Sequence, residues 1–418
     1  MLEAQEVKDY VEHFLNFVFK DEINIKVEEQ SYLINNKLNV KIYRFWEKDY
    51  KSLLEDFEGY SFKNDYIGTI FFFLSGYWEY INNDKRDIHG RFPSKESFSY
   101  KKNILEEPIV DIIVNKISQK LNLAYREFFC SPKFLITHDI DYLSLLDNKR
   151  FISSLGGDIL LRKNLKMALD KVRKKINKDD PHSISRLLNI HKKYNTKGIF
   201  FFLTDFQPSN TKGGYNLYTE KNRLKEIKEE IVHANCNIGI HYDSRYLETD
   251  RLKSDIEKLE DIFKIKIISG RAHYLKFDIT KSFDLYEKSG ILIDTTGLYA
   301  DAIGFRFGTS YPFIPYNFKE KRMYNVLEVP LIVMDTTLKS NIYMNLSPEE
   351  GLSKIINLMH KVKKYNGIFT LLWHNTSFYS GGWAEWEHIL EKAIENGIQN
   401  DFYFIDEDIL LNHYFKNE

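Results

Sequence analysis

The chain has 418 residues, of which 43% are apolar and 15% aromatic, with 59 basic against 60 acidic side chains. This length favours two domains, unless one of them is a barrel of about 250 residues. The balanced charge argues against a nucleic-acid-binding protein, which needs a strong basic excess. Cys130 and Cys236 form no close pair, so we expect neither a disulfide framework nor a cysteine zinc site, and the thiols fit a reducing compartment.

Residues 1–128 are predicted to form a smaller α+β domain. Apolar residues at helical spacing between Val7 and Val18 indicate an amphipathic first helix and not a signal peptide. The aromatic run 66–80 is shorter than the roughly 20 residues that span a bilayer, so we expect one buried helix there. Pro108 opens a further helix. With no predicted transmembrane segment, we expect a cytoplasmic protein.

From residue 129 to 418, short apolar runs alternate with helical stretches. This alternation predicts seven or eight strand–helix units in a parallel α/β barrel. The expected strands are 134–137, 198–204, 236–241, 265–269, 291–294, 327–334, 367–373 and 403–405.

One basic stretch, 148–180, carries apolar residues at helical spacing. It is interpreted as a solvated helical insertion, or as a peripheral contact with an anionic membrane surface or a phosphate-bearing substrate.

Two carboxylates end the first strand of the predicted barrel. Asp139 and Asp141 follow the apolar run that begins at Phe134, and their i, i+2 spacing places them on one side of a regular strand. Two carboxylates in one pocket are hard to ionise together unless a cation lies beside them. The pair therefore indicates a metal site, with an Asp-rich turn as the alternative.

Polar side chains also follow the later strands of the predicted barrel. Because active sites of such barrels form at the carboxyl ends of the strands, we expect these side chains to converge. They are His241, Tyr242 and Asp243 after the third strand, Arg271 and His273 after the fourth, Asp335 after the sixth, and Trp373 and His374 after the seventh.

The order of these strand ends resembles the polysaccharide deacetylases of carbohydrate esterase family four, over about residues 130 to 418. Thr137-His138-Asp139-Ile140-Asp141 looks like the first motif of that family, and it implies Asp139 as the general base and Asp141 as a metal ligand. The resemblance also implies His241 as a ligand, Arg271 as the residue that orients the base, and His374 as the general acid. It further implies a distorted (β/α)7-8 barrel of the polysaccharide deacetylase type. Where the family has a second metal histidine, this chain has Arg245.

Other stretches look like one branch of these deacetylases, which is found with bacterial surface-polysaccharide genes. They are 273–277, 304–308 and 329–335. The first 128 residues resemble the amino-terminal domain of unknown function of that branch, through GRFPSKESFSYK and the helix after Pro108.

The third metal ligand is open at the level of sequence. His273 is the first choice because it directly follows a neighbouring strand, although it could instead hydrogen-bond a loop; Asp243 and His138 are weaker candidates. We expect a divalent ion, zinc in the first place. Arg306, Tyr242, Trp373 and Asp335 are predicted to bind substrate, Arg306 through an anionic group unless it forms a salt bridge.

Hydrolysis of an acetamide needs an activated water, a stabilised oxyanion and a protonated leaving nitrogen. The sequence therefore predicts a metal-dependent hydrolase that removes an acetyl group from an amino sugar, free, nucleotide-linked or lipid-linked, during assembly of a surface polysaccharide. Two alternatives stay open. One is a catalytically degenerate carbohydrate-binding barrel, motivated by Arg245, and the other is a deformylase or metal-independent amidohydrolase on the same fold.

Overall fold

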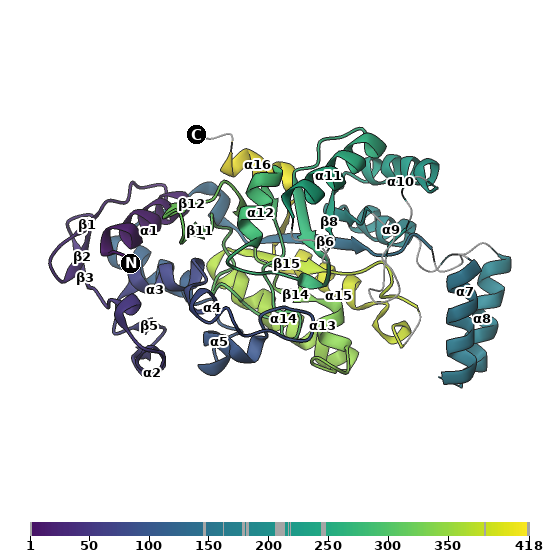
Figure 1. The fold of residues 1–418 in the computed structure, drawn as a ribbon, viewed down its shortest axis with the longest axis horizontal. Coiled ribbons are helices and arrows are strands. Elements are labelled where there is room, and N and C mark those ends of the chain that lie inside the picture. Colours follow the sequence, from purple (N-terminus) through teal and green to yellow (C-terminus); the bar gives the residue numbers. More distant parts are fainter. Residues whose placement is uncertain are drawn as a thin grey trace.

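A parallel sheet curled into a barrel forms the centre of the molecule (Figure 1). The computed structural model describes residues 2–144, 148–161, 163–177, 180, 184–204, 214–215, 217, 219–243, 248–379 and 382–415. The strand order is β13-β10-β9-β8-β7-β6-β15-β14, with β16 paired to β6. The strands are β6 (Lys133–Ile140), β7 (Gly198–Phe202), β8 (Asn237–Tyr242), β9 (Ser269–Ala272), β10 (Ile293–Asp294), β13 (Leu327–Glu328), β14 (Val333–Met334), β15 (Ile368–Leu372) and β16 (Tyr403–Phe404).

Strand β6 is the central strand of this sheet. All eight of its residues are buried, and it pairs in parallel with β7, β15 and β16. A continuous apolar run is typical of a strand that is covered on both faces. The carboxyl end of β6 therefore lies between the carboxyl ends of its parallel neighbours. The predicted α/β barrel is confirmed.

The barrel closes through a crossing segment and not through a ladder of paired strands. β13 and β14 lie at opposite ends of the sheet, yet only residues 329–332 separate them in the chain. The N–H of Val329 bonds to Asp294 on one side, and the N–H of Ile332 bonds to Thr370 on the other. The predicted single strand over 327–334 is thus wrong, because the chain changes its pairing partner around Pro330, which has no N–H to donate.

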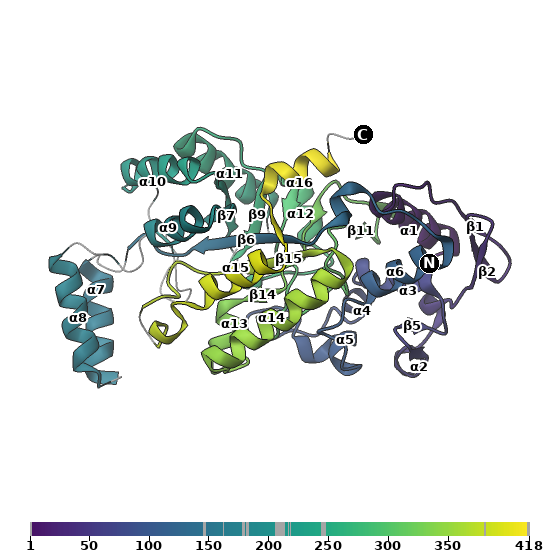
Figure 2. The ribbon, with the colours of Figure 1, turned by 180° about the vertical axis from the view of Figure 1, so that it is seen from behind.

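Helices cover the outside of the sheet, as Figures 1 and 2 show from opposite sides. Ser347 caps helix α14 and forms a capping box with Glu350. The helices of this layer are α9 (Ile184–Tyr194), α10 (Lys221–His233), α11 (Thr249–Phe263), α12 (Ser282–Ser289), α13 (Asp335–Lys339), α14 (Pro348–Tyr365), α15 (Ile389–Gln399) and α16 (Glu407–Tyr414).

The amino-terminal part packs helices around small antiparallel sheets. Its elements are α1 (Ala4–Val18), β1 (Ile25–Val27), β2 (Ser31–Ile34), β3 (Leu38–Lys41), α2 (Tyr50–Glu55), β4 (Phe57–Glu58), β5 (Ser61–Phe62), α3 (Tyr66–Leu74), α4 (Tyr77–Ile81), α5 (Phe98–Lys101) and α6 (Ile109–Leu121). The single helix predicted over the aromatic run is wrong, since Gly76 adopts a left-handed φ of 65° and separates α3 from α4. A domain boundary near residue 128 stays a prediction.

A helical hairpin follows β6 and stands away from the barrel at the right of Figure 1. It consists of α7 (Asn148–Gly156), a π-helical turn (Gly157–Leu161) and α8 (Leu165–Ile176). This is the predicted helical insertion as far as residues 148–161 and 163–177 are described. In the described part of the chain, we find no helix that combines the length and the apolar character needed to cross a membrane. Cys130 and Cys236 are both free thiols.

Candidate active site

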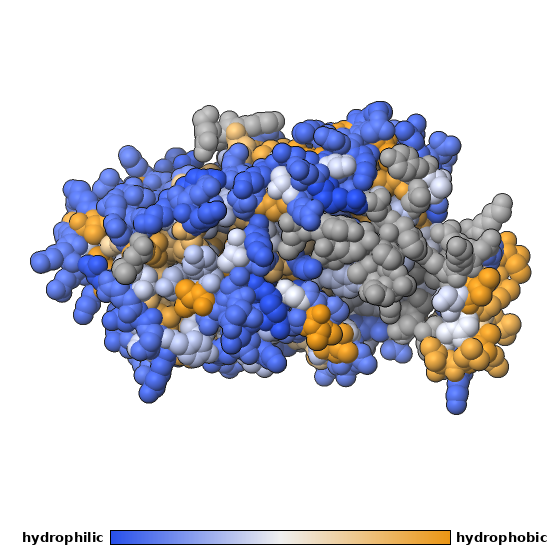
Figure 3. All heavy atoms as spheres, viewed as in Figure 1, coloured by the Kyte–Doolittle hydropathy of each residue, from blue (hydrophilic) through white to orange (hydrophobic). Residues whose placement is uncertain are grey.

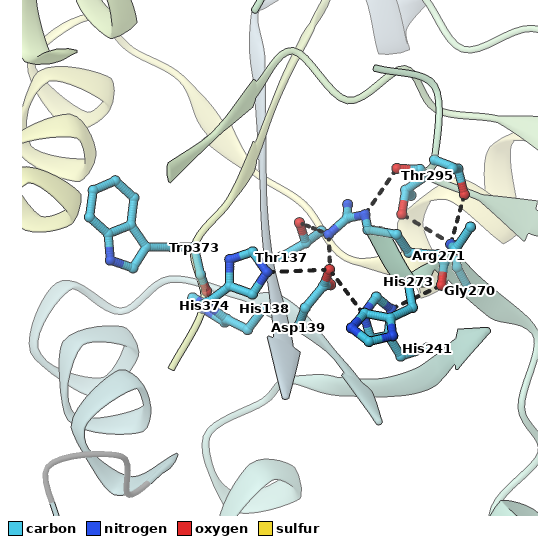
Figure 4. A network of polar contacts seen from close by, with 12 residues as sticks. Thr137, His138, Asp139, His241, Gly270, Arg271, His273, Thr295, Trp373 and His374 are labelled. Atoms are coloured by element: carbon cyan, nitrogen blue, oxygen red, sulfur yellow. Dashed lines mark hydrogen bonds and ion pairs between the residues drawn. The ribbon is translucent and has the colours of Figure 1, made fainter. Parts of the chain in front are cut away.

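Five polar side chains meet at the carboxyl ends of β6, β8, β9 and β15 (Figure 4). They are Asp139, Asp141, His241, His273 and His374, and nitrogen–oxygen distances of 3.5 to 4.0 Å separate the imidazoles from the carboxylates. Strand β9 begins later than the predicted strand 265–269, so that Arg271 lies within the strand and His273 directly after it. The structure therefore brings these five side chains together at one end of the sheet.

Three of these side chains could hold a cation. Asp141, His241 and His273 offer ligand atoms that all lie within 4.8 Å of one another. The Nε2 atoms of His241 and His273 lie 3.5 and 3.7 Å from Oδ1 of Asp141. Ligand atoms about 2.0–2.2 Å from a zinc ion in tetrahedral geometry stand roughly 3.3–3.6 Å apart. The two separations from Asp141 are therefore close to those around a small divalent ion.

The hydrogen bonding of the group also suits a cation. Nδ1 of His241 lies 3.0 Å from the carbonyl of Arg271, so the ring donates there and its Nε2 carries a free lone pair. That Nε2 and Oδ1 of Asp141 are buried and have no hydrogen-bond partner among the described residues. Buried polar atoms are nearly always satisfied, so this pair of acceptors is best explained as a ligand set.

The protonation states agree with metal binding. Burial lowers the pKa of His273 to about 4, so its imidazole is neutral at pH 7 and able to coordinate. Burial raises the pKa of Asp141, but the imidazoles of His241, His273 and His374 outweigh it and hold that pKa below its ordinary value. The carboxylate of Asp141 and the neutral imidazole of His273 are thus available beside His241.

Asp139 is held by a buried arginine. Nη1 of Arg271 donates to Oδ1 of Asp139 at 3.1 Å and to the Thr137 hydroxyl at 2.8 Å, and Nε donates to the carbonyl of Thr295 at 3.0 Å. The Arg271 guanidinium is fully buried over the ring of Phe201. This pairing leaves Oδ2 of Asp139 pointing toward His241 and His374 (Figure 4), as a proton acceptor would.

His374 is placed as a proton donor on the other side of Asp139. Its Nδ1 and its backbone N–H both donate to the carboxylate of Asp335, each at 2.7 Å. Burial alone lowers the pKa of His374, but Asp335, with help from Asp141 and Asp139, raises it to about 10. A protonated Nε2 of His374 then lies 4.0 Å from carboxylate oxygens of Asp139 and Asp141.

The four residues predicted to bind substrate are placed differently. Tyr242 follows His241 and Trp373 precedes His374, so both side chains point to the face opposite the site. Tyr242 stacks on the ring of Tyr286, and Trp373 points away from the cluster in Figure 4. Arg306 takes its salt-bridge alternative, with a buried pair to Glu79. Asp335 orients His374, a partner that the sequence spacing did not indicate.

The weaker ligand candidates do not join the cluster. His138 points to the outer face of β6, where its Nε2 lies 2.9 Å from Nε2 of His191 and its Nδ1 2.7 Å from the carbonyl of Trp373. Asp243 is buried but is not one of the three grouped ligands. Arg245 lies outside the described residues.

A residue of the amino-terminal part reaches the loop that follows His273. Nη1 of Arg91 donates to the carbonyl of Tyr274 at 3.0 Å, while the guanidinium also pairs with Asp87. Tyr274 and Leu275 both have left-handed φ values, 61° and 49°. Such conformations persist where surrounding contacts enforce them. Arg91 lies in the GRFP segment, whose polar residues are compatible with a loop that packs on the barrel, although the sequence did not identify Tyr274 as the partner.

Comparisons with known proteins add the following. A model of a family of unknown function (DUF7033) matches residues 3–126, and no curated protein matches the chain. A presumed polysaccharide deacetylase from Mycobacterium smegmatis is 16% identical, with 69% of this chain and 92% of that chain covered and a TM-score of 0.45. The polysaccharide deacetylase Bc1974 from Bacillus cereus is 9% identical, with coverages of 66% and 91% and a TM-score of 0.35.

A pseudoenzyme of the CE4 family from Bacillus anthracis is 13% identical, with coverages of 64% and 63% and a TM-score of 0.33. Deacetylases and a pseudoenzyme therefore both occur among the solved structures that are similar to this chain. TM-scores below 0.5 say nothing about the activity of this chain. Its activity has to be inferred from the residues of the site itself.

Proposed function

We propose that this protein is a metal-dependent hydrolase that removes an acyl group, acetyl in the first place, from the nitrogen of an amino sugar. The observation that carries the proposal is the placement of a carboxylate acceptor, Asp139, and a protonated imidazole, His374, beside the three-residue group of Asp141, His241 and His273. Amide hydrolysis needs these functions in one pocket.

Each residue has a defined part in the proposed reaction. A divalent ion held by Asp141, His241 and His273 would polarise the acyl carbonyl and lower the pKa of a water molecule. Asp139, oriented by Arg271, accepts the proton of the attacking water. His374, kept protonated by Asp335, donates a proton to the departing nitrogen. The ligand set of two imidazoles and one carboxylate favours zinc over magnesium or calcium.

The proposal also covers the amino-terminal domain, the substrate class and the cellular compartment. We propose residues 1–128 as an amino-terminal domain that narrows the mouth of a deacetylase-like barrel over 129–418, with Arg91 as its contact to the site. The substrate would be a bacterial surface-polysaccharide precursor, nucleotide-linked or lipid-linked, in the cytoplasm. The two free thiols fit that compartment.

Metal analysis of the purified protein is the first test. We expect about one equivalent of a divalent ion per chain, zinc before others, after removal and re-addition of metal. His241→Ala and His273→Ala are expected to lose it, whereas His233→Ala, at an exposed position of α10, is expected to keep it. A wild-type protein that takes up no metal after supplementation would contradict the proposal in favour of the metal-independent alternative.

Acyl release from acetylated amino sugars is the second test. Asp139→Asn and His374→Ala are expected to abolish acetate release while the bound metal and the fold persist. Formate in place of acetate would redirect the assignment to a deformylase. Sugar binding by a metal-loaded protein that releases neither acid would support the carbohydrate-binding alternative and contradict catalysis.

A further inference from the structure

The hairpin of α7 and α8 carries an apolar stripe on its outside. Leu165, Leu169, Val172 and Ile176 follow one another at i, i+4, i+7 and i+11, so at about 100° per residue they fall within roughly 60° on one face of α8. Their exposed fractions are 65%, 71%, 38% and 75%. Figure 3 shows this outer face as a patch of apolar atoms on the hairpin at the lower right.

The hairpin buries one charged pair together with the apolar side chains of Phe151 and Ala168. The ammonium of Lys171 forms an ion pair with the carboxylate of Asp158, and both side chains are fully buried between the helices. At the turn, Leu160 and Leu161 are exposed by 76% and 82%. Helices of globular proteins place their apolar stripe toward a core. The apolar stripe of α8 is instead exposed, so it is available to a partner outside the chain's own core.

Basic residues flank the apolar stripe. From 148 to 177 the sequence contains nine basic and two acidic residues, and one of each forms the buried pair. Lys163, Lys166 and Arg173 are exposed, and on α8 the last two lie about 80–100° from Leu165 around the helix axis. An apolar stripe with cations along its border complements the boundary between acyl chains and anionic headgroups.

The hairpin stands beside the mouth of the barrel. It begins at residue 148, shortly after the candidate ligand Asp141. The hydroxyl of Tyr379, in the loop that follows His374, donates to the carboxylate of Asp170, and the ammonium of Lys174 lies over the Tyr379 ring at 5.2 Å. A surface that binds the hairpin is therefore brought close to the candidate active site.

We propose that the α7–α8 hairpin binds the interface of an anionic lipid bilayer. The stripe of Leu165, Leu169, Val172 and Ile176 enters the acyl boundary, and the flanking Lys and Arg side chains lie among the headgroups. A bound hairpin would turn the mouth of the barrel toward the membrane. If the proposed function holds, as this step requires, the favoured substrate is an acylated amino sugar carried on a lipid anchor.

Vesicle sedimentation tests the proposal with the full-length protein. We expect wild type to sediment with vesicles of equal parts phosphatidylcholine and phosphatidylglycerol, and much less with phosphatidylcholine alone or at high salt. The double substitution Leu165→Asp with Leu169→Asp should weaken binding at least about tenfold. Ile88→Asp is the matched control, because Ile88 is 95% exposed on the amino-terminal part and should leave binding unchanged.

Several outcomes would overturn the proposal. One is wild type that sediments with neither lipid mixture, and another is a double variant that binds as wild type does although circular dichroism shows that both are folded. A dimer in analytical ultracentrifugation that the double variant loses, without vesicle binding, would assign the stripe to a second copy of the chain. Asp139→Asn is expected to sediment as wild type does, so vesicle binding without acetate release contradicts the proposed reaction alone, and acetate release without vesicle binding contradicts the membrane proposal alone.

Discussion

Asp335 accepts two hydrogen bonds from His374, one from the backbone N–H and one from Nδ1 of the ring, each at 2.7 Å. The two bonds fix the ring plane and leave Nε2 directed at Asp139 and Asp141. The same carboxylate supplies much of the charge that raises the pKa of His374 to about 10 against the opposing effect of burial. Orientation and proton affinity of the proposed acid therefore depend on one residue.

Asp335→Asn should impair the proposed acid. We expect kcat to fall by about 10²-fold or more, since general acid catalysis contributes about 10²–10⁴. Because the raised pKa keeps His374 protonated to high pH, the loss of the Asp335 charge should move the alkaline limb of the pH–rate profile to lower pH. Asp49→Asn, at the exposed cap of α2, is the control. An unchanged alkaline limb in the Asp335 variant would count against this role.

Arg271→Ala should destabilise the barrel. The substitution leaves the carboxylate of Asp139 buried without its cation, and breaking such a buried pair costs about 3–5 kcal/mol of the free energy of unfolding. Urea denaturation measures the loss. Arg322→Ala, which removes an exposed guanidinium that pairs with Glu287 and Glu320 at the surface, should cost less than about 1 kcal/mol. Equal effects of the two substitutions would contradict the importance of the Arg271–Asp139 pair.

Arg91→Ala should weaken metal binding without removing a ligand. Arg91 holds the carbonyl of Tyr274, whose backbone is left-handed and directly follows His273. Loss of a group that positions a ligand typically lowers metal affinity about 10–100-fold. Competition with a chromogenic chelator measures this affinity. Arg86→Ala, which breaks an ion pair with Asp278 in the same segment, is the matched control and should leave the affinity unchanged.

The buried pair of His138 and His191 should make stability depend on pH. Burial lowers the pKa of His191 to about 4 and that of His138 well below its ordinary value. The unfolded chain then binds protons that the folded chain does not, so the free energy of unfolding should fall as pH drops from about 6.5 to 4, by about 3 kcal/mol from His191 alone. His191→Gln should flatten this dependence in denaturation curves measured across that range. The same slope in both proteins would exclude this origin.

Much of the candidate site follows from local chain geometry. An apolar run that ends in Asp139 and Asp141 predicts a buried strand with two carboxylates on one side, and His374 follows a second such run. Strand alternation also contains a signal that the sequence predictions did not use. His138 adjoins Asp139, Tyr242 adjoins His241, and Trp373 adjoins His374, so each first-named residue had to face away from the site.

Only the packed chain decided the partners of these side chains. Arg306 with Glu79, Arg91 with the carbonyl of Tyr274, and Asp335 with His374 join segments that lie far apart in sequence. The choice of His273 as third ligand is of the same kind, because it depends on where β9 begins beside β8. Covalent geometry sets the direction of a side chain within its own strand. The distance between side chains on two different strands is set by strand register, barrel closure and core packing, and no local sequence pattern encodes these.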